Sequence, residues 1–297
     1  MCTRIRSGLR TALLLAGGAV AALLPLHALR AQAPAPAAPS GSGVGDLLVA
    51  PTRVVLEGRV RTAEIALVNK GNASATYRIS IVHMRMDENG GMKEIETPAP
   101  GEQFADDLVR YAPREVTLAP GVSQTVRIQV RKPENLAPGE YRSHLLFRAV
   151  PPAEAPSTAT GEMRVQLRPV FGVSIPLIVR HGDLTGAAKL AGLELVPVKS
   201  GDPAGAKPSL RVRIDRSGNA SVFGNLTVTF VPAAGGKLTV VGIVNGLAVY
   251  TPNAYRTVEI SLNVPPGMEL RHGSLRVRYG KSETAADVLA EAALALP

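Results

Sequence analysis

The stretch that decides the fold reads Met163-Arg-Val-Gln-Leu-Arg-Pro-Val-Phe-Gly-Val-Ser-Ile-Pro-Leu-Ile-Val-Arg180. Apolar residues recur at nearly every second position, and the side chains of an extended strand alternate between its two faces. One face would then carry a long apolar row, made of Val165, Leu167, Phe171, Val173, Ile175, Leu177 and Val179. Such a strand exceeds the usual length of about five or six residues. It could pair within its own domain and still offer apolar side chains to another chain.

Alternating segments bounded by turn residues continue on both sides of this stretch. Clear examples are residues 62–68, 123–130, 140–150, 209–215, 221–231 and 255–264. Turn signals recur about every ten residues, which is typical of antiparallel sandwiches. The sequence therefore predicts an all-β protein with two immunoglobulin-like β-sandwich domains, 46–181 and 186–297. The segment 285–296 stays open, because its alanines favour a helix while the fold favours a further strand.

The N-terminus has the layout of a secretory signal. Arg4, Arg6 and Arg10 precede an apolar stretch, 11–26, and the small residues around Ala31 and Ala33 follow it. We expect residues 1–33 to be a signal peptide that is cleaved, and 34–45 to be a disordered leader rich in Ala and Pro. A membrane anchor is the alternative. The apolar run is shorter and more broken than the span of about 20 residues that an anchor needs, so no stable membrane insertion is expected.

Composition narrows the class of protein further. The single cysteine, Cys2, lies in the predicted signal, so the exported chain would have no disulfide. The whole chain has 33 Lys and Arg against 24 Asp and Glu; loss of the four arginines in 1–33 leaves 29 − 24 = +5. This charge is spread along the chain without a basic cluster, and a clustered stripe is typical of nucleic-acid binding. Nucleic acid is therefore not an expected partner.

The sequence contains no motif that indicates an enzyme. His83, His144, His181 and His272 have no metal-binding spacing, and there is no nucleophile elbow, P-loop or dinucleotide fingerprint. We therefore expect no catalytic residues, no metal and no cofactor. An enzyme with an unrecognised site remains an alternative, and it would require a cluster of titratable groups in a cleft.

Several motifs resemble, in order, the PapD-type periplasmic pilus (fimbrial) assembly chaperones. The run Leu48-Val-Ala-Pro-Thr-Arg-Val-Val-Leu-Glu-Gly58 resembles the first strand of that family. The segments 63–69, 111–114, 118–121, 124–128 and 140–145 follow in the family's order, so the resemblance covers about 47–181. Over 190–297 it rests on strand spacing alone. It implies a periplasmic chaperone that completes pilus subunits by donor-strand complementation, with an outer-membrane usher as a further partner.

The resemblance also implies an anchor for the client's C-terminal carboxylate. Arg53 falls on the family's first cleft cation and shares one face with Val49, Pro51 and Val55; the alternative is a solvent-facing arginine on an edge strand. The family's second cation, a lysine, is replaced by Pro176. Arg168 and Arg180 are the candidates to take its place.

Two further sets of residues follow from the same resemblance. The donated side chains would be Val165, Leu167, Phe171 and Val173. Glu140 and Arg180 match two members of an interdomain charged network, whereas Arg278 stands where the family has an acidic third member. The main alternative function is a secreted or surface structural or adhesive β-sandwich protein without chaperone activity. The long 163–180 strand favours the chaperone, because an adhesin has no need of an exposed donor edge.

Overall fold

Alternating side chains form strands throughout the described part of the chain. The computed structural model describes residues 46–151, 170–198, 203, 205–281 and 287–297, all of which lie within one compact unit, Ser42–Pro297. None of these residues lies in an α-helix; η1 (Asp106–Leu108) is a single 3₁₀ turn, and Asp287 also has 3₁₀ conformation. No helix within these ranges is long and apolar enough to cross a membrane. The predicted all-β fold is confirmed.

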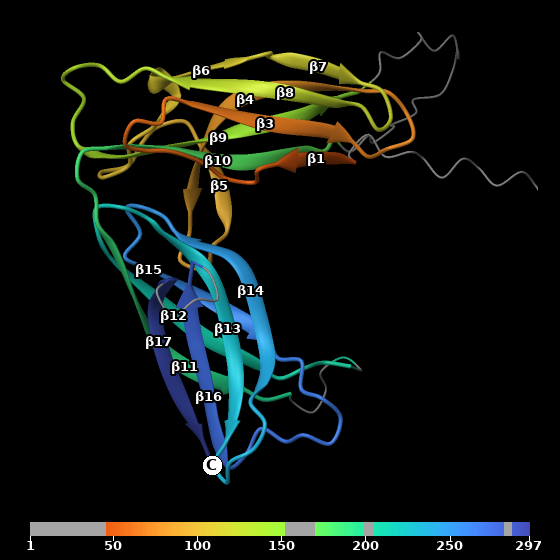
Figure 1. Ribbon diagram of the computed structural model, residues 1–297, viewed down its shortest axis with the longest axis vertical. Helices are drawn as coiled ribbons and strands as arrows, with labels where there is room; N and C mark the ends of the chain where they lie inside the picture. The colour runs from red at the N-terminus through yellow and green to blue at the C-terminus, as the bar shows by residue number, and fades with distance from the viewer. Residues whose placement is uncertain (1–45, 152–169, 199–202, 204, 282–286) are drawn as a thin grey trace, which may run out of the picture. The chain divides into compact units, whose positions relative to one another are not determined.

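The N-terminal sandwich consists of two sheets that enclose one hydrophobic core (Figure 1). The first sheet has the order β1 (Leu47–Ala50), β3 (Thr62–Asn69), β8 (Ser123–Val130), β6 (Val109–Ala112). The second has the order β2 (Val54–Leu56), β10 (Gly172–His181), β9 (Gly139–Val150), β4 (Ala75–Met86), β5 (Met92–Ile95), with β7 (Glu115–Leu118) also paired to β4. The core of the N-terminal sandwich is built around large buried side chains such as Tyr77 and Phe147.

The C-terminal sandwich also has two sheets and a core of its own. One sheet has the order β11 (Gly186–Val196), β12 (Ser209–Gly218), β15 (Tyr255–Ser261). The other has the order β14 (Thr239–Val249), β13 (Val222–Pro232), β16 (Gly273–Gly280), β17 (Val288–Leu296). The predicted pair of immunoglobulin-like sandwiches is therefore present.

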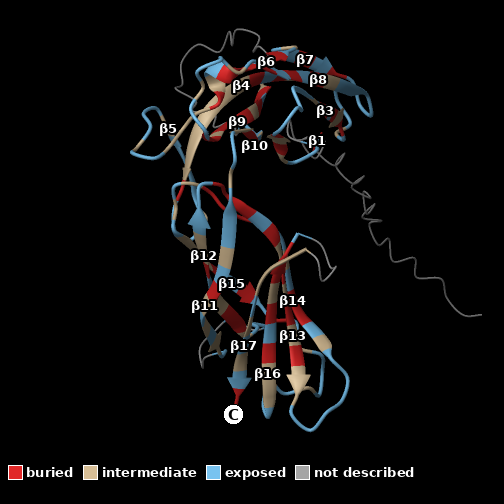
Figure 2. Cartoon of the chain, turned by 60° about the vertical axis from the view of Figure 1, so that its left-hand side comes forward, coloured by how far each residue is buried: buried red, intermediate tan, exposed pale blue. Residues whose placement is uncertain are grey.

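Burial follows the period of two that the sequence predicts. Along β13 the side chains of Leu226, Val228 and Phe230 are buried, while the residues between them are partly exposed. Figure 2 shows the same alternation of burial along β16. The ambiguous C-terminal segment is a strand, because β17 pairs with β16 from Leu296↔Gly273 to Val288↔Gly280. The small helix preference of alanine is outweighed by this ladder and by the burial of Leu296.

The apolar row of the 163–180 stretch changes from exposed to buried side chains along β10. Ile175, Leu177 and Val179 are buried in the N-terminal core. Phe171, just before the strand, is 52% exposed. Ile178 points from the opposite face and is buried within the second core cluster. The expected beginning of the strand at residues 163–169 lies outside the described residues.

Candidate functional site

The strand β10 is paired on one side along its whole length and on the other side only in part. It runs antiparallel to β9 from Gly172↔Arg148 to His181↔Gly139. The parallel strand β2 covers its other side only at Leu177, Ile178 and Val179. No described strand pairs with residues 172–176 on that side. Among the described residues, this sheet edge is therefore open directly before the segment of β10 that closes the protein's own core.

Pro176 marks the boundary of this open edge. The N–H of Ala149 donates to the carbonyl of Phe171 at 2.9 Å, so odd-numbered residues of the segment bond to β9. In an antiparallel ladder, the residues between them direct their backbone groups to the opposite side. Pro176 therefore lacks an N–H on the open side only, a position that proline tolerates in sheets. Gly172 and Ser174 are the described residues of β10 whose backbone groups can bond to a new strand there.

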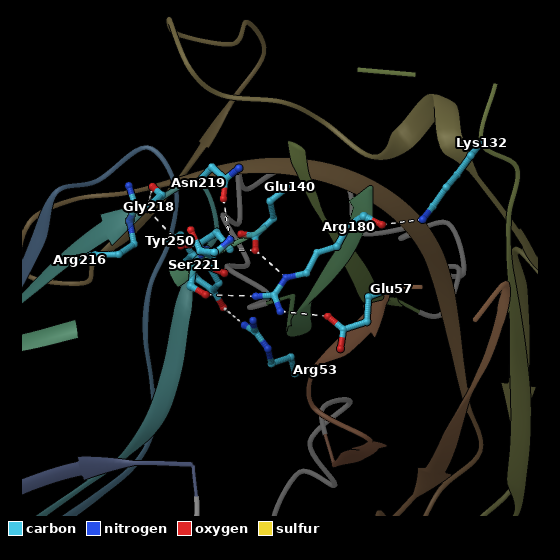
Figure 3. Close-up of polar contacts among 12 residues, drawn as sticks. Arg53, Glu57, Lys132, Glu140, Arg180, Arg216, Gly218, Asn219, Ser221 and Tyr250 are labelled. Carbon is cyan, nitrogen blue, oxygen red and sulfur yellow. Dashed lines mark hydrogen bonds and ion pairs between the residues drawn. The ribbon is translucent and has the colours of Figure 1, made fainter. Parts of the chain in front are cut away.

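Arg180 is the centre of a charged network that joins both sandwiches (Figure 3). Its Nε donates to Glu140 Oε2 at 3.0 Å, its Nη1 to Glu57 Oε2 at 3.1 Å, and its Nη2 to the carbonyl of Ser221 at 3.1 Å. The Glu140 side chain is fully buried and also accepts the backbone N–H of Ser221. The two residues expected to form an interdomain pair are thus in direct contact, and every nitrogen of the Arg180 guanidinium is engaged.

Arg53 lies near this network but is bound differently. Its Nη1 donates to the hydroxyl oxygen of Tyr250 at 3.2 Å. Its guanidinium carbon lies 4.5 Å from the centre of the Phe223 ring and 5.6 Å from that of Tyr250. Burial lowers the pKa of Arg53, while the nearby Tyr250 and Glu140 act in the opposite direction. Neither Nε nor Nη2 of Arg53 has a hydrogen-bond partner among the described residues.

A buried histidine also lies beside Tyr250. His144, on β9, meets the Tyr250 ring edge-on with 6.4 Å between ring centres. Its pKa is lowered to about 3, first by burial and then by the positive charges of Arg142, Arg53 and His83. His144 is therefore neutral at any pH near 7 and adds no further positive charge beside Arg53 and Arg142.

A cavity of about 480 Å³ opens beside Arg53. Its walls carry three cations and one carboxylate, together with apolar and small residues: Arg53, Val55, Glu57, Arg180, Leu184, Gly186, Ala220, Ser221, Val222, Phe223, Lys281 and Leu289. The Ser221 hydroxyl is buried without a hydrogen-bond partner among the described residues. An excess of positive charge with open donors suits a carboxylate.

The sequence did not reveal Phe223, Tyr250 or Lys281 as members of this site. They come from the second sandwich, and Tyr250 is 197 positions away from Arg53. None belongs to a motif with a fixed spacing, so no local signal could have identified them. Arg278, which replaces the family's acidic residue, lies on β16 with its Nε 3.6 Å from Glu291 Oε1.

The expected donor residues are described only in part. Val165, Leu167 and Arg168 lie outside the described residues. Phe171 is exposed, whereas Val173 is partly buried and packs against the N-terminal core. Nowhere in the described ranges do three His, Cys, Asp or Glu residues lie close enough to hold a metal ion.

Comparison with known proteins gives one family. Residues 46–182 match the pili and flagellar-assembly chaperones, in the PapD N-terminal domain. A search of curated protein sequences finds no match. Among solved structures, the chain is similar to the Pseudomonas aeruginosa CupB2 chaperone, at 15% identity and a TM-score of 0.42, over 84% of this chain and all of that one. It is also similar to a chain of the Salmonella enterica SafA pilin–SafB chaperone complex, at 16% identity and a TM-score of 0.40, over 85% of this chain and 97% of that one.

Proposed function

We propose that this protein is a periplasmic chaperone that binds pilus-type subunits by donor-strand complementation, because residues 46–182 match the family of pili and flagellar-assembly chaperones. The family consists of chaperones and not of enzymes, which agrees with the absence of catalytic motifs in the sequence. Its members act in the periplasm, so the N-terminal segment 1–33 would serve as an export signal.

The open edge of β10 is the observation that carries this proposal. A strand from a partner could pair with Gly172 and Ser174, where β2 leaves the backbone uncovered. Main-chain bonds of this kind give affinity, and alternate side chains supply specificity. The donated side chains would be Val165, Leu167, Phe171 and Val173. Phe171 is already exposed at the edge, while Val173 would divide its contacts between the client and its own core.

Arg53 is the favoured anchor for the carboxylate at the end of the client. It lines the cavity and keeps two nitrogens without partners among the described residues. Arg180 already bonds to Glu140, Glu57 and Ser221, so its role is to hold the network. Arg168 lies outside the described residues and remains a second candidate.

The partners would be pilus-type subunits whose sandwich lacks one strand. The SafB chaperone is named in complex with the SafA pilin, and a client of that kind suits an open edge with an apolar row. An outer-membrane usher would receive the loaded chaperone. Neither nucleic acid nor a cofactor has a part in this function.

The test is co-expression with a pilus-type subunit encoded in the same genome. A tag on this protein should co-purify the subunit from the periplasm. Phe171→Glu should reduce the recovered subunit at least about tenfold, because a charge replaces an apolar side chain whose burial is worth about 1.5–3 kcal/mol. Thermal unfolding should stay close to that of the wild type, because Phe171 is exposed.

Val122→Glu is the matched control, because Val122 is also exposed and lies in the turn between β7 and β8. It should leave co-purification unchanged. Equal recovery with wild type and Phe171→Glu would refute the donor strand. Lower thermal stability of Phe171→Glu alone would place Phe171 in the protein's own core.

A further inference from the structure

The anchor arginine is held by the second sandwich, although it belongs to the first. Arg53 precedes β2, whereas Phe223 lies in β13 and Tyr250 directly follows β14. One ring lies 4.5 Å from the guanidinium carbon and the other 5.6 Å, and the Tyr250 hydroxyl accepts a hydrogen bond from Nη1. A cation near two aromatic rings and one acceptor loses much of its rotational freedom.

Tyr250 is itself fixed from several sides. Its side chain is buried, and the guanidinium carbon of Arg142 lies 4.4 Å from its ring centre. Arg142 is held in turn by a 2.9 Å hydrogen bond from its Nη1 to the carbonyl of Met84. His144 meets the ring edge-on. The tyrosine is therefore a rigid support for Arg53, and its position is set by strands of the N-terminal sandwich.

This arrangement leaves part of the Arg53 fork available. Tyr250 engages Nη1, while Nε and Nη2 have no partner among the described residues. Two parallel N–H groups of an arginine match the two oxygens of a carboxylate. The neighbouring Arg180 offers no such pair, because all three of its nitrogens are engaged.

We propose that Tyr250 and Phe223 are positioning residues that hold the Arg53 fork for the terminal carboxylate of the client. This inference rests on the proposed function, and it adds that the second sandwich takes part in carboxylate recognition. Removing the Tyr250 hydroxyl or the Phe223 ring leaves the charge of Arg53 in place but releases its orientation. The protein then loses its preference for a chain end that carries a free carboxylate, while its affinity for the strand itself stays the same.

The experiment compares two synthetic peptides with the full protein. Both are alternating apolar ten-residue strands with a fluorescent label at the N-terminus; one ends in a free carboxylate and the other in an amide. The ratio of their dissociation constants, measured by anisotropy, isolates the carboxylate. Wild type should prefer the free acid by about 10- to 100-fold, as expected for a charge-assisted contact. Arg53→Ala should bring this ratio close to one.

Tyr250→Phe and Phe223→Leu should each lower the ratio at least about threefold, with unchanged binding of the amide. Adding Tyr250→Phe to Arg53→Ala should have no further effect on the ratio, because both act on one contact. The matched control is Tyr255→Phe. Tyr255 also has an arginine near its ring, Arg213 at 5.6 Å, but it does not line the cavity. This variant should keep the wild-type ratio.

The outcomes separate the inference from the function beneath it. If Arg53→Ala keeps the wild-type ratio, or if wild type shows no preference for the acid, the proposed anchor is wrong and the inference falls with it. If Arg53→Ala brings the ratio of dissociation constants to one but Tyr250→Phe and Phe223→Leu keep the wild-type ratio, only the positioning role is overturned. If either of these two variants binds the free-acid peptide and the amide peptide equally more weakly, it has lost structure, and this result also contradicts the inference.

Discussion

Arg53 and Arg180 lie at the same junction and show two ways of stabilising an arginine. Arg180 is surrounded by oxygen atoms, from two carboxylates and a backbone carbonyl. Arg53 is surrounded mainly by aromatic carbon, with one phenol oxygen as its partner. The first arrangement engages every nitrogen of the guanidinium and joins the two sandwiches. The second restrains the side chain and leaves Nε and Nη2 without partners among the described residues, which is why we propose Arg53 and not Arg180 as the ligand-binding arginine.

Residue type alone could not distinguish the roles of Arg53 and Arg180. Both are arginines of the N-terminal sandwich, Arg53 just before β2 and Arg180 within β10, and both were candidate anchors. Their roles differ because Glu140, which is fully buried, needs a compensating charge and Arg180 provides it. A structural role is therefore assigned by the neighbours that an arginine satisfies, and a binding role by the donors that it keeps.

Arg180→Ala should give the largest loss of stability. Glu140 would remain buried without its direct ion pair to Arg180, and breaking a buried pair in this way typically costs about 3–5 kcal/mol. Arg53→Ala should cost only about 1–2 kcal/mol, because it removes one hydrogen bond and the ring contacts. Urea unfolding of the two variants measures both free energies.

The double variant Glu140→Gln/Arg180→Met is the control for this prediction. It removes both charges and should recover a large part of the stability that Arg180→Ala loses. Equal losses of unfolding free energy in Arg53→Ala and Arg180→Ala would mean that the two arginines stabilise the fold in the same way.

His144 should make the Arg53 side of the junction sensitive to acid. Its pKa is about 3 in the folded chain and near 6.5 when unfolded. The unfolded chain therefore binds the proton more readily than the folded chain. The contribution of His144 to the free energy of unfolding is constant above about pH 7 and decreases as the pH falls from about 6.5 to 3. The slope from this one group approaches about 1.4 kcal/mol per pH unit inside that window.

His144→Phe should remove this slope between about pH 6 and pH 5, a range in which ordinary carboxylates remain mostly ionised. Urea unfolding at several pH values compares the variant with wild type. Parallel curves for the two proteins over this range would show that His144 is already accessible to protons in the folded chain.

Lys281→Ala should have the smallest effect of these substitutions, and it tests the positive charge of the cavity wall beside Arg53. Lys281 is exposed, so its removal should leave the free energy of unfolding nearly unchanged. It adds positive charge to the cavity wall beside Arg53. We expect the free-acid peptide to bind about two- to fivefold more weakly at low salt, and the difference to shrink as salt is added. A difference that is independent of salt would argue against an electrostatic role.

The alternation of apolar residues predicted the strands well because it reports a local property. A side chain two positions away lies on the same face whatever the partner strand is, so β3, β8 and β13 are visible in the sequence. The short strand β5 was not predicted, because its four residues carry little alternation. Alanine propensity left β17 undecided, and only its ladder with β16 settled the question.

The sequence alone was sufficient for the all-β class and the apolar row of 163–180, and it predicted an export signal and the candidacy of Arg53. Each of these depends on residues close together in the chain. The tertiary structure decided which part of the row is used internally, since Ile175, Leu177 and Val179 are buried in the core while Phe171 is exposed. It also shows that all three nitrogens of the Arg180 guanidinium donate hydrogen bonds, whereas Arg53 has one such bond, to Tyr250, among the described residues. Those distinctions depend on neighbours 40 to 197 positions away, which are brought together only when the sandwiches fold.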